Sequence, residues 1–500
     1  MWLAGRVVLL QWISLRIIKS RLLGSFMSEL EQKLKADIDS VFAEQQCYSL
    51  SLRTSTCEQR LAVLSKFETV FKASYDKLYK AAAEDFSKPQ AEVDTGEILS
   101  VLSELKHVRK SLKRWMQPTR VRATAAMLGT KSKILSEPKG VTLIISPWNY
   151  PFNLSFGPMI LSIAAGNTVI LKPSEMTPAM SAVIQDIVEQ AFDPKQVCVF
   201  QGDASVSSYL TAKPFNHIYF TGSPAVGRHV MAAAAKNLAS VTLELGGKSP
   251  VIIDQTADLK KAANSICFGK FANNGQTCIA PDYVYVHSNV REQFLDAMRD
   301  AIESLYGKPS DIANNPDYCR VVNQLHYQRI KSLLDNAVEN GASVIAGGET
   351  FDEQRFIAPT LLANINPDSD IMQEEIFGPV LPILDFLDIG TVIGEINNKP
   401  KPLALYVFSS NKLTVKQVID QTSAGDSAVN ATVIHVLHQN LPFGGVNNSG
   451  MGKSGGVWGF QAFSHQRSVV EDKLGLSAML SPPYTPKVRG LIKAALKFLS

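Results

Sequence analysis

The stretch from Val141 to Lys172 reads VTLIISPWNYPFNLSFGPMILSIAAGNTVILK, and it decides the fold class. It begins with a short continuous apolar run, as expected of a strand that is buried in a parallel sheet. A helical run that ends at Gly166 follows, and a second apolar run, Thr168–Leu171, completes the unit. Strands and helices keep alternating at this spacing to about residue 245, which predicts βαβ units in a doubly wound sheet.

The rest of the chain divides into segments of different character. Residues 28–117 are rich in Glu, Lys, Leu and Ala and have the apolar spacing of helices. A second α/β stretch begins near residue 246. We therefore predict an α/β protein with two doubly wound (Rossmann-like) domains and a small β arm. The expected parts are a first α/β domain (28–117 and 139–245), a second (246–448), the arm (118–138 and 462–482), an N-terminal extension (1–27) and a C-terminal tail (483–500).

The arm is predicted from a hairpin pattern at Pro118–Glu137 and a strand near Arg467–Leu474. The hairpin residues alternate between small, polar and β-branched types and offer few side chains for a core. Because an isolated two-stranded hairpin is marginally stable in water, we expect the arm to complete a sheet in a partner subunit.

Composition limits the possible functions. The chain has 500 residues, of which 45% are hydrophobic and 19% charged, and a net charge of +4. It has no basic stripe interleaved with aromatic residues, so we expect no nucleic-acid partner. The six cysteines are far apart and form no C-x-x-C pair. This spacing argues against a disulfide framework or a structural zinc site and favours a reducing compartment, the cytoplasm.

The N-terminus leaves three interpretations open. From Met1 to Phe26 the chain has no acidic residue and four basic ones. A mitochondrial presequence has this composition, although the charges fall on most sides of a helical wheel. Export or anchoring is the second interpretation, and the uncharged run Val7–Leu15 is too short to span a bilayer. The third is a start codon assigned too far upstream, with translation beginning at Met27.

Two motifs follow strands of the first domain. Lys172 and Glu175 come at the end of one strand, where ligands bind in open α/β sheets. Their ammonium and carboxylate could bond ribose hydroxyls, or they could form a surface pair. In FTGSPAVGR, Gly222 and Gly227 join a strand to a helix and could admit a pyrophosphate. A tightly packed glycine turn is the alternative there.

Three further residues are candidates for chemistry. Asn149 lies in SPWNYPFN just after a buried strand, where its amide could stabilise an oxyanion or simply satisfy its own turn. Glu244 interrupts an apolar strand, which is costly for a carboxylate without a use or a partner. Cys278 is flanked by Asn, Gly, Gln and Thr, which is not a core environment, but its reactivity would require a lowered pKa.

Taken together, these motifs resemble the aldehyde dehydrogenase superfamily, and the resemblance runs from about Arg60 to Lys473. Its most specific parts are SPWNYPFNLSFGPMI, LELGGKSPVIID, NNGQTCIAPDYVYV, EEIFGPVLPI and LPFGGVNNSGMGKSGG. The sequences CIAPDY, KPLALYVFS and LPFGGVNNSGMG look most like the class 3 branch, which oxidises medium- and long-chain aliphatic and aromatic aldehydes. The resemblance implies that the first domain binds NAD and that the second is catalytic.

The resemblance also implies residue roles. Cys278 would be the nucleophile, Asn149 an oxyanion donor, and Glu244 the base that activates water. Lys172 and Glu175 would bind the adenosine ribose. The remaining cofactor contacts would be Gly222, Ser223 and Gly227 at the pyrophosphate, and Glu375 and Phe377 at the nicotinamide ribose and ring. Pro224 departs from the family pattern because it has no N–H to donate.

The expected function is therefore oxidation of an aldehyde by NAD, with NADP tolerated, in a homodimer and without a metal. Alternatives are a CoA-acylating or semialdehyde dehydrogenase of the same superfamily, a cysteine hydrolase, or a catalytically silent relative. Glu244 argues against CoA acylation, and none of the eight histidines lies in a hydrolase-like motif. The location would be mitochondrial if residues 1–26 are a presequence.

The tail forms a basic amphipathic pattern. Apolar residues including Val488 and Ile492 share one helical face, and Arg489, Lys493 and Lys497 lie opposite. Such a helix could contact a membrane surface or pack on its own dimer.

Overall fold

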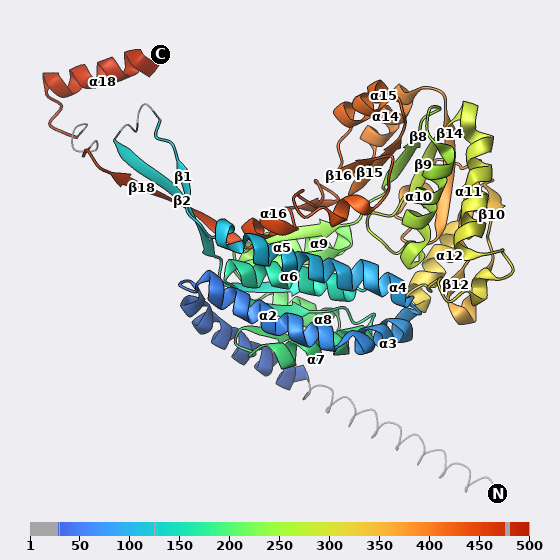
Figure 1. Ribbon diagram of the computed structural model, residues 1–500, viewed down its shortest axis with the longest axis horizontal. Helices are drawn as coiled ribbons and strands as arrows, with labels where there is room; N and C mark the ends of the chain where they lie inside the picture. Colours follow the sequence, from blue (N-terminus) through green and yellow to red (C-terminus); the bar gives the residue numbers. More distant parts are fainter. Residues whose placement is uncertain (1–28, 30, 125–126, 128, 476–480, 500) are drawn as a thin grey trace, which may run out of the picture.

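The computed structural model describes residues 29, 31–124, 127, 129–475 and 481–499. The predictions for residues 1–27 lie outside these ranges. The described chain forms two α/β domains side by side, from which a narrow sheet and the C-terminal helix extend (Figure 1).

The first domain is built on a six-stranded sheet in the order β17-β7-β6-β3-β4-β5. All neighbouring strands are parallel except β17, which pairs antiparallel with β7. β3 and β4 are fully buried, as the apolar runs predict. The strands are β3 (Val141–Ile145), β4 (Thr168–Lys172), β5 (Val197–Val199), β6 (His217–Gly222), β7 (Ser240–Leu245) and β17 (Gly450–Met451).

Helices cover both faces of this sheet. One core joins β3 and β4 to the packed helices α2, α3, α5, α6 and α7, and a second core lies between the other face and the helix of residues 31–52, α8 and α9. The helices are α2 (Cys57–Ala73), α3 (Tyr75–Phe86), α4 (Gln90–Val93), the π-helix η1 (Asp94–Ile98), α5 (Leu99–Trp115), α6 (Pro151–Ala165), α7 (Pro178–Ala191), α8 (Ala204–Thr211) and α9 (Pro224–Lys236).

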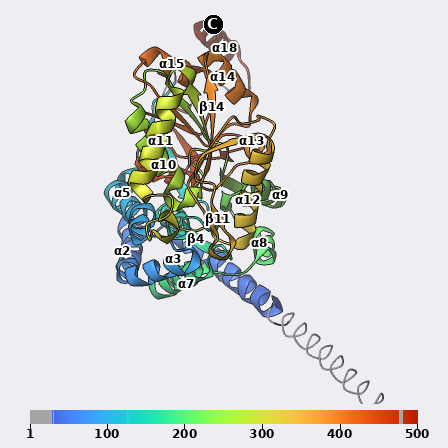
Figure 2. The same ribbon diagram turned by 90° about the vertical axis from the view of Figure 1, so that its right-hand side faces the viewer.

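The second domain has a seven-stranded sheet in the order β10-β13-β14-β9-β8-β15-β16, parallel except for β10. Figure 2 shows α10 and α11 on one side of it and α12 and α13 on the other. The strands are β8 (Pro250–Ile253), β9 (Tyr283–His287), β10 (Ser343–Ala346), β13 (Thr360–Ala363), β14 (Val380–Phe386), β15 (Ala404–Phe408) and β16 (Asp426–Val429). The helices are α10 (Leu259–Phe271), α11 (Arg291–Tyr306), α12 (Gln324–Glu339), α13 (Asp370–Gln373), α14 (Ile389–Asn398) and α15 (Lys412–Gln421). A small hairpin, β11 (Thr350–Phe351) and β12 (Phe356–Ile357), lies beside them.

The narrow sheet consists of β1 (Thr119–Val121), β2 (Thr130–Pro138) and β18 (Ser464–Asp472), with β2 in the middle. β18 follows α16 (Gly456–Ala462) and pairs with β2 over its whole length. Most side chains of the three strands are exposed or half-buried, so the narrow sheet has little core of its own. Both outer strands present an unpaired edge within the described chain, which suits pairing with a second copy.

The tail forms α18 (Pro486–Leu499), which lies beyond the narrow sheet and away from both domains (Figure 1). Among the described residues, no helix is long and apolar enough to cross a membrane. Whether α18 contacts a membrane surface or a partner subunit stays a prediction.

Candidate active site

The candidate residues of the first domain gather at one edge of its sheet. From β3 the chain winds outward to β4 and β5, and it then returns to place β6 and β7 on the other side of β3. The sheet therefore has a topological switch point between β3 and β6, and ligands bind beyond the carboxyl ends of strands at such a point. Asn149, Lys172, Gly222 and Glu244 all lie in or just after these strand ends.

Cys278 follows a short loop whose backbone needs unusual residues. Asn273 and Asn274 adopt left-handed conformations (φ 52° and 57°), which Asn tolerates better than most residues. Gly275 has φ 71°, and a Cβ there would lie 2.4 Å from the carbonyl oxygen of Gly378. This contact requires glycine and packs the cysteine loop against the EEIFGP segment.

Asn149 is bonded to the same loop. Its Nδ2 donates to the carbonyl of Gln276 at 3.0 Å, and its side chain is buried. An Asn amide has two N–H donors, so one remains for a substrate oxygen. The amide is therefore not occupied in its own turn, which was the alternative at this position.

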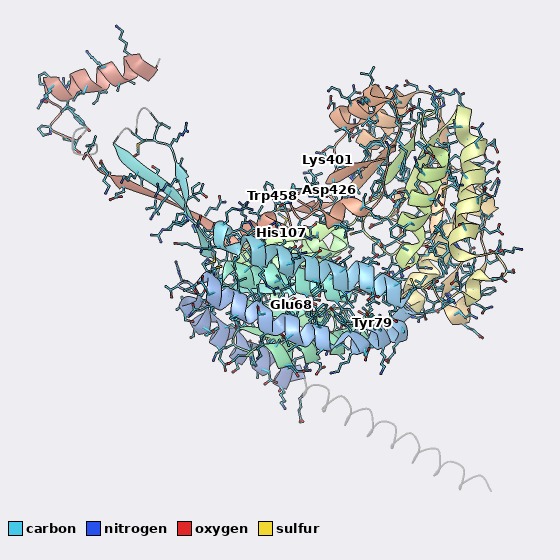
Figure 3. All side chains as sticks on the ribbon, in the orientation of Figure 1. Glu68, Tyr79, His107, Lys401, Asp426 and Trp458 are labelled. Atoms are coloured by element: carbon cyan, nitrogen blue, oxygen red, sulfur yellow. The ribbon has the colours of Figure 1, made fainter. Side chains whose placement is uncertain are left out.

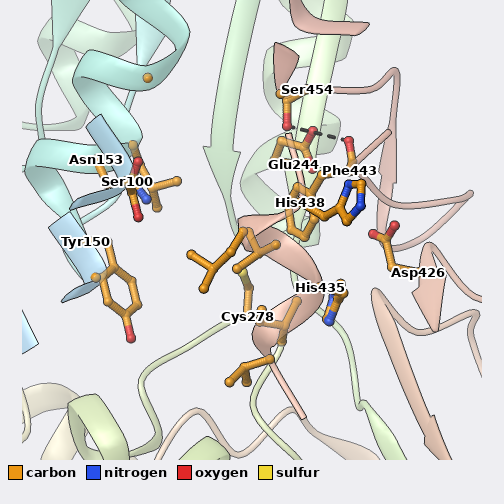
Figure 4. Close-up of a pocket in the computed structure, with 18 of the residues that line it drawn as sticks. Ser100, Tyr150, Asn153, Glu244, Cys278, Asp426, His435, His438, Phe443 and Ser454 are labelled. Carbon is orange, nitrogen blue, oxygen red and sulfur yellow. Dashed lines mark hydrogen bonds between the residues drawn. The ribbon is translucent and has the colours of Figure 1, made fainter. Parts of the chain in front are cut away.

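Glu244 lies buried in β7, opposite Gly450 of β17. Neither of its carboxylate oxygens has a hydrogen-bond partner among the described residues. The Ser454 hydroxyl lies beside it but donates at 3.5 Å to the carbonyl of Phe443 (Figure 4). Burial raises the pKa of Glu244 to about 8, so this carboxyl group can both take up and release a proton near neutral pH.

The thiol of Cys278 is not acidic in this structure. Burial, Glu375 and Glu244 raise its pKa to about 12. The lowered pKa that a reactive cysteine is expected to have is therefore absent here, because burial disfavours the thiolate and two carboxylates add to this effect. Attack by this cysteine requires a base that removes the proton as the new bond forms.

Cys278 and Glu244 line one cavity of about 340 Å³ at the junction of the two domains (Figure 4). Figure 3 places Asp426, another lining residue, at the edge of the second domain that faces the first. Much of the wall is apolar. The apolar lining residues include Leu154, Leu161, Phe268, Ile279, Ile434, Val436, Leu437, Leu441 and Phe443.

His435 also lines this cavity, and the sequence offered no motif to find it. Its ring lies 5.9 Å from that of Tyr406, whose hydroxyl donates to the carbonyl of Ile279 at 2.6 Å. The histidine is therefore close to the cysteine loop. Neither ring nitrogen of His435 has a hydrogen-bond partner among the described residues, so the imidazole is not paired with Cys278 as in a cysteine hydrolase. Burial also lowers its pKa to about 4, which makes it a weak base.

The ribose candidates are paired with each other. Lys172 is buried at the end of β4, and its ammonium lies 2.6 Å from the half-exposed carboxylate of Glu175. A buried cation held beside an accessible carboxylate at the switch point fits two adjacent hydroxyls of a ribose.

The glycine segment forms the start of α9. Ser223 caps this helix and accepts a hydrogen bond from the backbone N–H of Val226 at 3.3 Å. Pro224 takes the first helical position, where its missing N–H costs nothing. A Cβ on Gly227 would lie 2.7 Å from the Leu245 side chain, so this glycine permits close packing of helix on strand. The N-terminus of α9, directly after β6, suits a pyrophosphate.

Glu375 and Phe377 reach the site from the second domain. A Cβ on Gly246 would lie 2.2 Å from the Glu375 carboxylate, so the acid packs directly on the end of β7. The Phe377 ring lies edge-on to Trp148 at 5.3 Å. Arg329, which the sequence did not indicate, donates to the carbonyl of Glu375 at 3.1 Å and thereby holds this segment.

The donor set at the switch point therefore fits a dinucleotide. Among the described residues there is no cluster of three or more His, Cys, Asp or Glu side chains that could hold a metal ion.

Comparison with known proteins decides the family. The model of the aldehyde dehydrogenase family matches residues 18–469. The chain belongs to the aldehyde dehydrogenase family. It is 42% identical to the 4,4'-diaponeurosporen-aldehyde dehydrogenase of Staphylococcus aureus, over 94% of this chain and 100% of the relative. It is 41% identical to the dimeric NADP-preferring aldehyde dehydrogenase of Rattus norvegicus, over 84% and 92% of the two chains.

A solved structure, the substrate-bound state of Staphylococcus aureus AldH, has the same fold. It superposes with a TM-score of 0.88 at 41% identity and covers 92% of this chain and 99% of its own. The protein is thus an NAD(P)-dependent aldehyde dehydrogenase with the α/β fold of that family.

Proposed function

We propose that this aldehyde dehydrogenase oxidises medium- and long-chain aliphatic aldehydes, and aromatic aldehydes second, to carboxylic acids. The observation that carries the proposal is the shared cavity, which Cys278 and Glu244 both line and whose wall is largely apolar. Burying an alkyl chain against such a wall contributes about 0.8 kcal/mol for each CH₂ group.

In the proposed reaction the Cys278 sulfur attacks the aldehyde carbonyl and its proton passes to Glu244. The resulting thiohemiacetal oxyanion accepts hydrogen bonds from the free N–H of Asn149 and from the backbone N–H of Cys278. Bound NAD⁺ supplies the acceptor for the hydride that leaves the carbon. The product is a thioester on Cys278. Glu244 next releases the thiol proton to solvent. It then takes a proton from the water that attacks the thioester carbonyl and passes this proton to the departing sulfur, so that the carboxylic acid is released and the Cys278 thiol is restored.

For the cofactor, we propose that Lys172 and Glu175 bind the adenosine ribose and that Gly222, Ser223 and Gly227 surround the pyrophosphate. Glu375 and Phe377 would position the nicotinamide ribose and ring. The carboxylate of Glu175 should repel a 2′-phosphate, so NAD is preferred and NADP is tolerated.

The charge of the cavity argues against the alternatives. The described residues that line it include four acids and neither Lys nor Arg. The carboxylate of a semialdehyde would lose its hydration in this cavity without a partner cation, which costs binding energy. The acids are Glu92, Glu104, Glu244 and Asp426. The presence of Glu244 supports hydrolysis over CoA acylation, and the presence of Cys278 with Asn149 argues against a silent relative.

A screen of NADH formation tests this proposal. Hexanal, decanal, hexadecenal, benzaldehyde and coniferyl aldehyde are compared with succinate semialdehyde at equal concentration. We expect the highest kcat/KM for the aliphatic aldehydes of six or more carbons. Activity confined to short or carboxylate-bearing aldehydes would overturn the proposed substrate class.

We also propose a homodimer joined through the arm, because β1, β2 and β18 form a sheet whose outer strands, β1 and β18, have unpaired edges and which has little core. Sedimentation that shows a monomer at micromolar protein would contradict it. The six cysteines all lie in the described residues and are free, which supports a reducing compartment such as the cytoplasm.

A further inference from the structure

Asn149 is held through its backbone as well as through its amide. Its carbonyl oxygen accepts hydrogen bonds from Lys88 Nζ at 3.2 Å and from Asn273 Nδ2 at 3.1 Å. Asn273 belongs to the cysteine loop, whereas Lys88 lies between α3 and α4. The proposed oxyanion donor is therefore tied to the nucleophile loop on one side and to the N-terminal helices on the other.

The Lys88 side chain is fully buried and fully satisfied. Its ammonium lies 3.0 Å from the Glu97 carboxylate, which is also fully buried, and 3.9 Å from the ring centroid of Tyr150. With the carbonyl of Asn149, these groups give each of the three N–H donors an acceptor or a π face. Two of the three groups that these donors meet, the Asn149 carbonyl and the Tyr150 ring, belong to the SPWNYPFN loop.

Glu97 holds the other end of the same loop. It lies in η1, and π-helical turns of this kind occur often at functional sites. Its second oxygen accepts from the backbone N–H of Asn153 at 2.9 Å, in the first turn of α6. α6 has no side-chain cap of its own, so Glu97 supplies one from another helix. The ion pair thus holds the loop at Asn149 and at Asn153.

Stability alone is a poor reason for such a pair. Replacing a buried ion pair by apolar residues of similar volume is often neutral or stabilising. What an apolar pair could not do is hold the Asn149 carbonyl and the N-terminus of α6 at the same time. We propose that Lys88 and Glu97 are positioning residues, whose ion pair holds Asn149 where its amide meets the oxyanion. This inference rests on the role proposed for Asn149.

The variant Lys88→Met removes the donor and keeps most of the side-chain volume. We expect the rate of the pre-steady-state NADH burst to fall about 10- to 100-fold, since a displacement of 1 Å can cost about 10²-fold. Asn149→Ala sets the upper limit of this decrease, because loss of one oxyanion donor lowers the rate about 10²–10³-fold. The KM for NAD should stay the same, since the ion pair has no contact with Lys172 or Glu175.

A double-mutant cycle tests whether Lys88 affects the burst rate through Asn149. If Lys88 acts through Asn149, Lys88→Met should lower the burst rate less than 3-fold in an Asn149→Ala background. An equal fold-loss in both backgrounds would overturn the inference. A normal burst in Asn149→Ala would instead remove the proposed oxyanion role, and the inference with it.

The double variant Lys88→Met/Glu97→Met separates an effect on the burst rate from an effect on the stability of the protein. This double variant removes both charges of the pair, and Glu92, on which Lys88 also acts, keeps its hydrogen bond from the backbone N–H of Asn273. We therefore expect a melting temperature near that of the wild type together with a slow burst. Normal melting with a normal burst would overturn the inference, and this variant carries the test if Lys88→Met alone does not fold. Lys77→Met is the matched control, because the Lys77–Asp186 ion pair is exposed and should leave both quantities unchanged.

Discussion

Nδ2 of Asn149 and the carbonyl oxygen of Gln276 are joined by a 3.0 Å hydrogen bond, two residues before Cys278. The two residues are 127 positions apart in the chain and come from different domains. The bond fixes the distance between the amide and the cysteine loop, and it leaves one amide N–H for the substrate. Asn149 and Cys278 should therefore act as one unit, and disturbing either side of this contact should slow the first half of the reaction.

Replacing Glu244 should separate the two halves of the reaction. Glu244→Gln keeps the shape of the side chain but cannot accept a proton. General-base help is worth about 10²–10⁴-fold, so we expect steady-state turnover to fall by about that much. A burst near one NADH per active subunit should survive, with the acyl group held on Cys278. Because Glu244 also takes the thiol proton in the proposed reaction, the burst should be slower.

Stopped-flow absorbance of NADH measures both phases. Cys278→Ser is the matched control and should show no burst, since a serine hydroxyl is hardly ionised near neutral pH. A Glu244→Gln enzyme that turns over almost normally would show that another group is the base.

The raised pKa of Glu244 predicts how turnover depends on pH. The base is the ionised form, and its pKa of about 8 lies above the usual range because the group is buried. Where hydrolysis of the thioester limits the rate, kcat should rise about tenfold per pH unit below pH 8 and level off above it. Measurement of kcat between pH 6 and 9.5 tests this, and a flat profile over this range would contradict the assignment.

Gly96 should not tolerate a larger residue. A Cβ there would lie 2.7 Å from Cε1 of Tyr150, whose hydroxyl is bonded to that of Thr277 at 2.9 Å. We expect Gly96→Ala to destabilise the protein by about 1–3 kcal/mol through overpacking and to slow the burst, because Tyr150 must move. Thermal unfolding and stopped-flow measurements report the two effects.

Gly394→Ala is the control for this substitution. Gly394 lies exposed in α14, and a Cβ there would meet no atom within 4 Å. Gly394→Ala should raise the free energy of unfolding by about 0.5–1 kcal/mol and leave the burst rate unchanged. Equal behaviour of the two variants would contradict the packing of Tyr150 on Gly96.

Replacing Glu175 should change the preference between the two cofactors. Glu175→Gln removes the negative charge that we expect near the ribose 2′ position and keeps a hydrogen-bonding group. The ratio of kcat/KM for NADP to that for NAD should rise about tenfold, which corresponds to about 1.4 kcal/mol. The ratio is measured with one aldehyde at saturation. An unchanged ratio would show that Glu175 does not face the ribose.

Local patterns in the sequence were sufficient to predict the alternation of strands and helices. The apolar runs at 141–145 and 168–171 are β3 and β4, and the hairpin pattern before Val141 contains β1 and β2. The buried carboxylate of Glu244 was predicted because an acid in an apolar strand is costly wherever that strand packs. The motifs around Cys278 and Asn149 were sufficient to indicate an aldehyde dehydrogenase, since each is a short continuous segment of the sequence.

Only the tertiary structure brought Lys88 and Glu97 to Asn149, which lies 61 residues after Lys88 in the chain. In the sequence they are two ordinary charges in a helical region rich in Lys and Glu. Likewise, the sequence gave no sign of His435 or Arg329. The high pKa of Cys278 depends first on burial and then on carboxylates from two other segments. The reason is physical: propensity and periodicity act between near neighbours in the chain, whereas burial and the pairing of buried charges depend on which helices and loops pack together.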